Sequence, residues 1–163
     1  MSTMKTLTDA QDFFTEVVDP SVRDFLAGPS TFKTAFHVAI SLFHAHEWIY
    51  ESKRNQVETH FGRAFSTKGD FWGFVETQVP EAAYVRDLAN ASKHVRLTIK
   101  PSTSMTHIAN TSIQSFGYGE GGYGQGRYGG SATVMMKDGA DEVSLDDCVQ
   151  KLSAFWAALM AAI

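Results

Sequence analysis

The chain has 163 residues, a length that suits one domain better than two. Apolar residues make up 44% and charged residues 20% of it, which excludes a disordered tail, a collagen-like fibre or a disulfide scaffold as the whole protein. The formal charge of −4 disfavours a strongly basic nucleic-acid binder but allows a local basic patch. A single cysteine, Cys148, can form no disulfide within the chain, and neither a membrane span nor a signal peptide is visible. We therefore expect a soluble cytoplasmic domain with no membrane partner.

The first thirty residues predict two short helices. Thr8, followed by Gln11, is typical of the capping box that begins a helix. The Asp19-Pro20 pair is expected to interrupt this helix and to begin a second one, which Gly28 ends.

The strongest helical signal covers residues 31–53, with Ser30 as the predicted cap. This stretch is apolar over so much of its circumference that we expect it to be the central helix of a bundle. The stretch 55–69 is ambiguous because Gly62 and Gly69 can each break a helix.

Two more helices are predicted before the periodicity changes. Asp70 can cap a short helix, and another helix is expected to begin near Pro80 and to run to about Lys93. Its buried stripe is predicted to consist of Tyr84, Leu88, Ala91 and Val95.

The following region reads as a small antiparallel sheet. Residues 95–99 alternate between apolar and polar, a second strand is plausible within 105–116, and a third is predicted over 133–137. Asp138-Gly139 is a strong hairpin-turn signal.

The last helix is predicted to begin at Ser144, with Asp147 as its capping partner. The predicted fold class is thus mainly α. A bundle of four to six helices in a single domain, residues 1–163, carries a β-hairpin or small-sheet insertion at 95–143, before the C-terminal helix.

A glycine- and tyrosine-rich loop is predicted at residues 117–130, with the sequence GYGEGGYGQGRYGG. It matches the dinucleotide pattern G-x-G-x-x-G in overlapping registers, but a strand rather than a helix is expected after it, which disfavours a Rossmann site. Either it is a long flexible hairpin loop, or its side chains contact single-stranded RNA or a protein partner. The candidate contacts are Tyr118, Tyr123, Arg127 and Tyr128.

The predicted helix 80–93 carries a polar face that is a candidate catalytic site. Arg86, Asp87, Asn90 and His94 lie on the side of the helix opposite its apolar stripe. A neutral histidine can act as a general base, and an arginine can hold a phosphate. Such a set could cleave RNA through its 2′-hydroxyl without a metal or cofactor. The alternative is an ordinary solvated helix face whose polar groups bond to their neighbours.

This run, RDLANASKH, together with the apolar helix before it and the amphipathic helix at the end of the chain, resembles the HEPN superfamily of helical bacterial proteins. Many HEPN proteins are metal-independent ribonucleases that work as dimers. The resemblance implies that Arg86 and His94 are the catalytic pair and that Asp87 is the polar residue after the arginine. Seven residues separate the pair here, more than in the usual motif, and this step turns His94 about 80° from Arg86. A degenerate relative that binds RNA or a nucleotide without cleaving it therefore stays open.

Helix 31–53 adds a histidine cluster. His44, His46 and Glu47 are candidate binding residues, with Lys93 of the later helix, and His37 lies two turns before His44. Histidine and carboxylate ligands would suit zinc, iron or manganese, but bundle metal sites repeat a Glu-x-x-His step on two helices. Here the order is His-x-x-Glu and it occurs once, so no metal is predicted.

Three classes of function remain. The first is a HEPN-like domain acting on RNA or a nucleotide, in which Arg86, Asn90 and His94 line a cleft at a dimer interface. The second is a non-catalytic protein-interaction or oligomerisation module, to which the many aromatic residues would contribute. The third, a metal-binding helical bundle, is the least favoured by the spacing.

Overall fold

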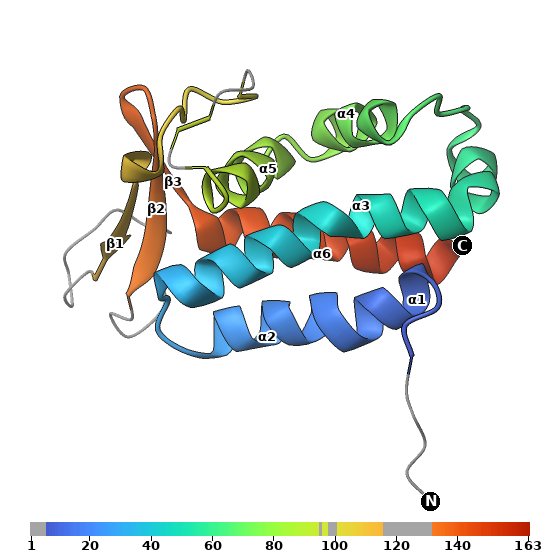
Figure 1. The fold of residues 1–163 in the computed structure, drawn as a ribbon, viewed down its shortest axis with the longest axis horizontal. Coiled ribbons are helices and arrows are strands. Elements are labelled where there is room, and N and C mark those ends of the chain that lie inside the picture. Colours follow the sequence, from blue (N-terminus) through green and yellow to red (C-terminus); the bar gives the residue numbers. More distant parts are fainter. Residues whose placement is uncertain (1–5, 95, 98–100, 116–131) are drawn as a thin grey trace, which may run out of the picture.

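The computed structural model describes residues 6–94, 96–97, 101–115 and 132–163, and it is mainly helical, with a small antiparallel sheet before the last helix (Figure 1). The predicted fold class is confirmed. In chain order the elements are α1 (Ala10–Phe13), a π turn (Phe14–Val18), α2 (Asp19–Ala27), α3 (Phe32–Phe61), α4 (Lys68–Gln78), α5 (Ala82–Ala91), a 3-10 turn (Ile108–Asn110), β1 (Thr111–Gln114), β2 (Thr133–Asp138), β3 (Asp141–Ser144) and α6 (Leu145–Ala162).

The predicted interruption at Pro20 is wrong, because α1, the π turn and α2 form one continuous helical segment. Val18 and Asp19 keep helical dihedral angles on the approach to the proline. Proline lacks the N–H that an α-helix needs there, and a π turn directly before it changes the local bonding pattern so that the helix can continue. Gly28 ends the segment, as predicted.

The first helix begins one residue later than predicted. The side chain of Asp9, rather than that of Thr8, accepts the capping hydrogen bond from the N–H of Asp12. The carboxylate of Asp12 accepts from the N–H of Thr8, the residue before the cap, so Asp12 and not Gln11 makes the return contact.

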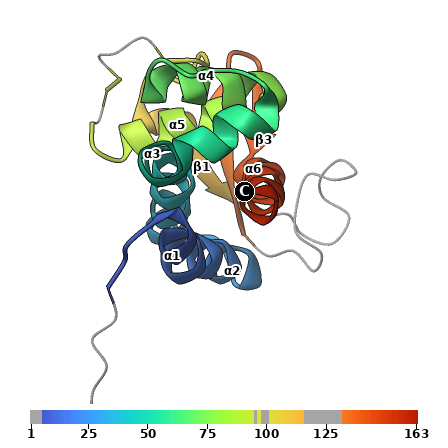
Figure 2. The same ribbon diagram turned by 90° about the vertical axis from the view of Figure 1, so that its right-hand side faces the viewer.

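Helix α3 is the centre of the bundle, as its apolar circumference predicts, because it contacts every other helix. It is much longer than predicted and ends at Gly62, whose φ of 61° is the left-handed conformation that glycine adopts without strain. Its cap is Thr31, in a capping box with Thr34, whereas Ser30 is buried just before it. Figures 1 and 2 show α6 alongside α3, with α1 and α2 on one side of the pair and α4 and α5 on the other.

The remaining helix boundaries differ from the predictions by small steps. Thr67 caps α4 by accepting from the N–H of Asp70, so Asp70 is the partner and not the cap. Helix α5 ends at Ala91, before Lys93. Ser144 is the cap residue of α6, but its side chain makes no capping hydrogen bond. No helix of the described part of the chain has the length and apolar content required to cross a bilayer.

The three strands form an antiparallel sheet in the order β1-β2-β3, at the end of the bundle where α6 begins (Figure 1). Asp138 pairs with Asp141 across a turn that contains Gly139 at φ 64°, which confirms the predicted hairpin turn. The first predicted strand is not formed where the structure describes it: the pairing there is a single bridge between Arg96 and His107. The glycine- and tyrosine-rich segment, residues 117–130, lies outside the described residues.

Candidate functional site

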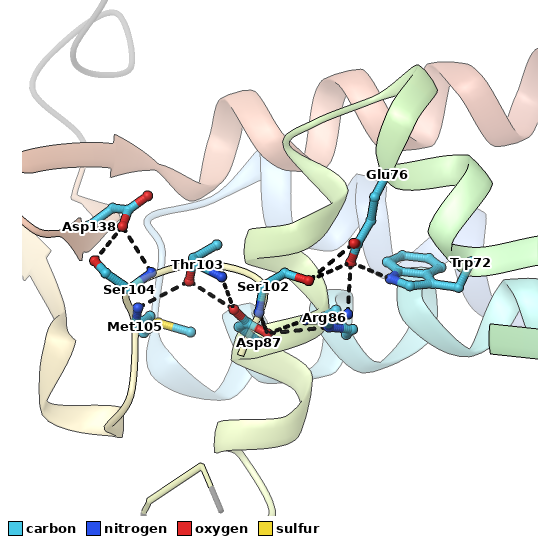
Figure 3. Close-up of polar contacts among 9 residues, drawn as sticks. All are labelled: Trp72, Glu76, Arg86, Asp87, Ser102, Thr103, Ser104, Met105 and Asp138. Carbon is cyan, nitrogen blue, oxygen red and sulfur yellow. Dashed lines mark hydrogen bonds and ion pairs between the residues drawn. The ribbon is translucent and has the colours of Figure 1, made fainter. Parts of the chain in front are cut away.

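Asp87 lies in the interior and holds the loop that follows α5. Its side chain is 1% exposed. One carboxylate oxygen accepts from the backbone N–H of Thr103 at 2.8 Å and from its hydroxyl at 2.8 Å, and the other accepts from the N–H of Ser102 at 3.3 Å (Figure 3). The buried carboxylate of Asp87 is thus satisfied by donors of this loop, and a buried charge without such partners would be costly.

Arg86 lies beside Asp87 and is engaged by two carboxylates. Its guanidinium is 3.1 Å from Glu76 of α4 and 3.2 Å from Asp87. Glu76 also accepts from the indole N–H of Trp72 at 2.7 Å and from the hydroxyl of Ser102 at 3.1 Å (Figure 3). The positive charge of Arg86 is therefore offset within the fold, and a phosphate bound to it would have to compete with both carboxylates.

Asn90 and His94 do not join this network. Asn90 is half-buried, and its backbone carbonyl accepts from the N–H groups of Lys93 and His94 at 3.1 Å each. Because α5 ends at Ala91, His94 lies beyond the helix, where it is exposed. The four residues of the predicted catalytic set are thus divided: half-buried Arg86 pairs with buried Asp87, Asn90 is half-buried outside this network, and His94 is exposed.

A second polar network joins α5 to the sheet, and the sequence gives no sign of it. The hydroxyl of Tyr84 donates to Asp138 at 2.5 Å, and Asp138 also accepts from the N–H of Ser104 at 3.0 Å and from its hydroxyl. These hydrogen bonds lower the pKa of Asp138, while burial and then the bond to Asp138 raise the pKa of Tyr84. The partners are far apart in the chain, so no local spacing predicts them.

The histidine cluster separates into one core residue and one surface group. His46 is buried, its ring lies against those of Phe43 and Trp72, and its Nδ1–H donates to the carbonyl of Phe43. Burial therefore removes His46 from the predicted binding residues. Within the described part of the chain, no group of three or more histidine, cysteine, aspartate or glutamate side chains is placed to hold a metal ion.

His46 makes the stability depend on pH. Burial lowers the pKa of His46 below 6.5, because the charged ring would lose its hydration. Below about pH 6.5 the unfolded chain binds a proton at His46 that the folded chain does not. The free energy of unfolding therefore decreases as the pH is lowered, by up to about 1.4 kcal/mol per pH unit, until the pKa of the folded state is reached. We expect urea unfolding between about pH 7.5 and pH 5.5 to show a steeper loss for the wild type than for His46→Gln. Equal losses would contradict this assignment.

The structure brings together three of the candidate binding residues, His44, Glu47 and Lys93. The Nδ1 of His44 is 3.7 Å from Glu47, and Lys93 donates to its Nε2 at 3.5 Å. This contact places the end of α5 against α3.

The single cysteine, Cys148, is buried. Burial raises the pKa of its thiol to about 12 and makes it a poor nucleophile.

A basic strip, exposed except at the half-buried His44, runs from the first half of α3 to the residues after α5. On α3, Lys33, His37 and His44 lie within about 40° of one another around the helix and span about 16 Å along it. His44 contacts Lys93, and further basic residues follow Lys93 in the sequence. The basic strip consists of Lys33, His37, His44, Lys93, His94 and Arg96. Within the described residues, its two lysines and its arginine make no ion pair.

The fold is therefore a helical bundle with an appended three-stranded sheet, and the basic strip lies on its surface. Comparison of the chain with known protein families, with curated proteins and with solved structures gave no match.

Proposed function

We propose that the chain is a HEPN-like protein of the cytoplasm that binds RNA along the basic strip and does not cleave it. The observation that carries the proposal is the set of exposed cations on the first half of α3 and just after α5. Lys33, Lys93 and Arg96 have no carboxylate partner among the described residues. Cations without a carboxylate partner are available to phosphates, which provide most of the affinity for nucleic acid. The net charge of −4 makes such a local concentration of basic residues more significant.

The proposal excludes cleavage because of the state of Arg86. An arginine that stabilises the charge developing on the phosphate oxygens must offer free N–H donors to them. Arg86 instead directs its guanidinium at Glu76 and Asp87, while His94 is exposed beyond the helix end. The dimer that the HEPN resemblance implies belongs to the same proposal, and sedimentation of the purified protein tests it.

The direct test is RNA binding by a variant with reversed charge. We expect Lys93→Glu to weaken binding of a fluorescent single-stranded RNA about tenfold at about 50 mM salt, and to reduce the slope of log K against log salt by about 1. The matched control is Arg23→Glu on α2, across α3 from α5, where a largely exposed arginine pairs only with exposed Asp19 among the described residues (Figure 1). Its charge change is the same, and its effect on binding should be small.

Three outcomes would contradict the proposal. Equal effects of Lys93→Glu and Arg23→Glu would show that binding depends on net charge and not on the strip. Cleavage of the RNA that is lost in His94→Ala, with the fold intact, would establish an active ribonuclease. Absence of binding would favour the second candidate, a protein-interaction module.

That second candidate has one structural observation in its favour. Strand β1 is an edge of the sheet, since within the described residues it pairs only with β2. Its Ile113 is one of the few large apolar side chains of the described chain that are exposed. An open strand edge beside an apolar side chain is a common site for addition of a partner strand.

A further inference from the structure

An exposed pair of aromatic rings lies at the start of α3, beside the basic strip. Phe32 is 41% exposed, although it is a large apolar side chain. Its ring stacks on that of Phe36, one turn further along, with a centroid distance of 6.0 Å and an interplanar angle of 29°. Phe36 is half-buried and packs against the core, so the pair has an anchored member and a member that meets solvent.

The pair and the strip occupy the same two turns of the helix. Lys33 and His37 each follow one of the phenylalanines directly in the sequence and are both exposed. Around the helix, each lies about 100° from the phenylalanine before it, so the aromatic rings form one border of the strip. A ligand that lies along Lys33 and His37 therefore passes an exposed aromatic face.

Aromatic rings next to unpaired cations are the combination that recognises single-stranded nucleic acid. The cations follow the phosphates, while the bases, which have free faces only when they are unpaired, stack on the aromatic side chains. In a duplex the base faces are covered by their neighbours, so a side chain such as Phe32 gains nothing from them. Phe32 is not among the side chains that form the core or pack against it, so core packing does not explain why an aromatic residue stands here.

We propose that the Phe32–Phe36 pair is a base-stacking platform and that the ligand of the basic strip is single-stranded RNA rather than duplex RNA. The inference rests on the proposed function and adds the strandedness of the ligand. Phe32 supplies the face that meets a base, and Phe36 fixes the orientation of its ring. Lys33 and His37 hold the adjoining phosphates.

The test compares one RNA sequence as a single strand and as a duplex, with 2-aminopurine as a fluorescent base in the single strand. We expect the wild type to bind the single strand about tenfold more tightly than the duplex and to change the 2-aminopurine fluorescence, since stacking on a protein ring has an effect of about this size. Phe32→Leu keeps an apolar side chain but removes the aromatic face. It should lose most of this preference and the fluorescence change, while its duplex affinity stays the same.

The controls separate failure of this inference from failure of the proposed function. Phe32→Trp should retain the preference, and Leu7→Ala, which alters an equally exposed apolar side chain before α1, should behave as the wild type. Equal affinity for single strand and duplex, with no effect of Phe32→Leu, would overturn the stacking platform and leave the basic strip as the binding surface. No binding of either form would overturn the proposed function, and the inference with it.

Discussion

Replacing Asp87 with alanine is expected to lower the free energy of unfolding by about 3–5 kcal/mol. The carboxylate is 1% exposed, and it accepts from the backbone of Ser102 and Thr103 and from the guanidinium of Arg86. Without it the loop donors lose their partners and Arg86 keeps a single carboxylate, Glu76, for its half-buried charge. A loss of this size is a large part of the stability of an ordinary domain.

Urea unfolding followed by circular dichroism measures this loss, and two further variants locate its cause. Asp87→Asn preserves the shape but places an NH2 group near the N–H donors, so it should also be strongly destabilising. Asp147→Ala removes an exposed carboxylate from the first turn of α6 and should cost less than about 1 kcal/mol. A loss below about 1 kcal/mol for Asp87→Ala would show that the loop is held by other contacts.

The role of Asp87 decides how variants of the candidate site can be interpreted. Because Arg86 and Asp87 support the same loop, Arg86→Ala is expected to change the structure as well as any interaction with RNA. A loss of activity in that variant would not distinguish catalysis from unfolding. His94 is exposed outside this network, so His94→Ala is the informative variant for a test of cleavage.

The helices and the sheet were largely predictable because their signals are local. The apolar repeat of α3 predicts both its helical state and its central position, and the Asp138-Gly139 pair specifies the tight turn between β2 and β3. Each signal depends on residues within a few positions of one another, which the sequence displays directly.

The end of α3 was less predictable, although Gly62 marks it, because the apolar repeat fades before the helix stops. Its last two turns are mainly polar, and they are stabilised by the Arg54–Glu58 ion pair and by burial of Val57. Glu58 also accepts from the N–H of Phe65, which holds the chain after the helix. The Arg54–Glu58 pair is visible in the sequence as an i,i+4 step, but the burial of Val57 and the bond from Phe65 are not, so apolar periodicity alone predicts a helix that is too short.

The candidate site shows the same division between local and distant information. The helical periodicity of α5 brings Arg86, Asp87 and Asn90 to one side, and a polar side reads as a solvated or catalytic face. In the structure, Glu76 of α4 and the loop at 101–104 meet that side and use its charges. Neither the packing of α4 on α5 nor the return of the loop is visible in the sequence of the helix itself.

Trp156 is the anchor between the two longest helices, and Trp156→Ala is expected to cost about 3–5 kcal/mol of stability. Its side chain is fully buried, lies near the rings of Phe71 and Trp72, and donates its indole N–H to the carbonyl of Leu42 in α3 at 3.1 Å. Removal of the ring leaves a cavity between α3, α4 and α6, and neighbouring side chains can fill it only in part.

The contribution of the hydrogen bond can be separated from that of volume. Trp156→Phe retains most of the ring but loses the indole donor, so we expect a loss of about 1–2 kcal/mol, since the carbonyl of Leu42 can keep its helical partner. Trp48→Ala is the matched control, because Trp48 is half-buried and stacks on Phe13 at 4.9 Å outside the fully buried core. In chemical unfolding, Trp48→Ala should lose less than half as much free energy of unfolding as Trp156→Ala. Equal losses for the two alanine variants would show that the α3–α6 contact is not the dominant packing interaction, and that stability depends as much on the N-terminal helices.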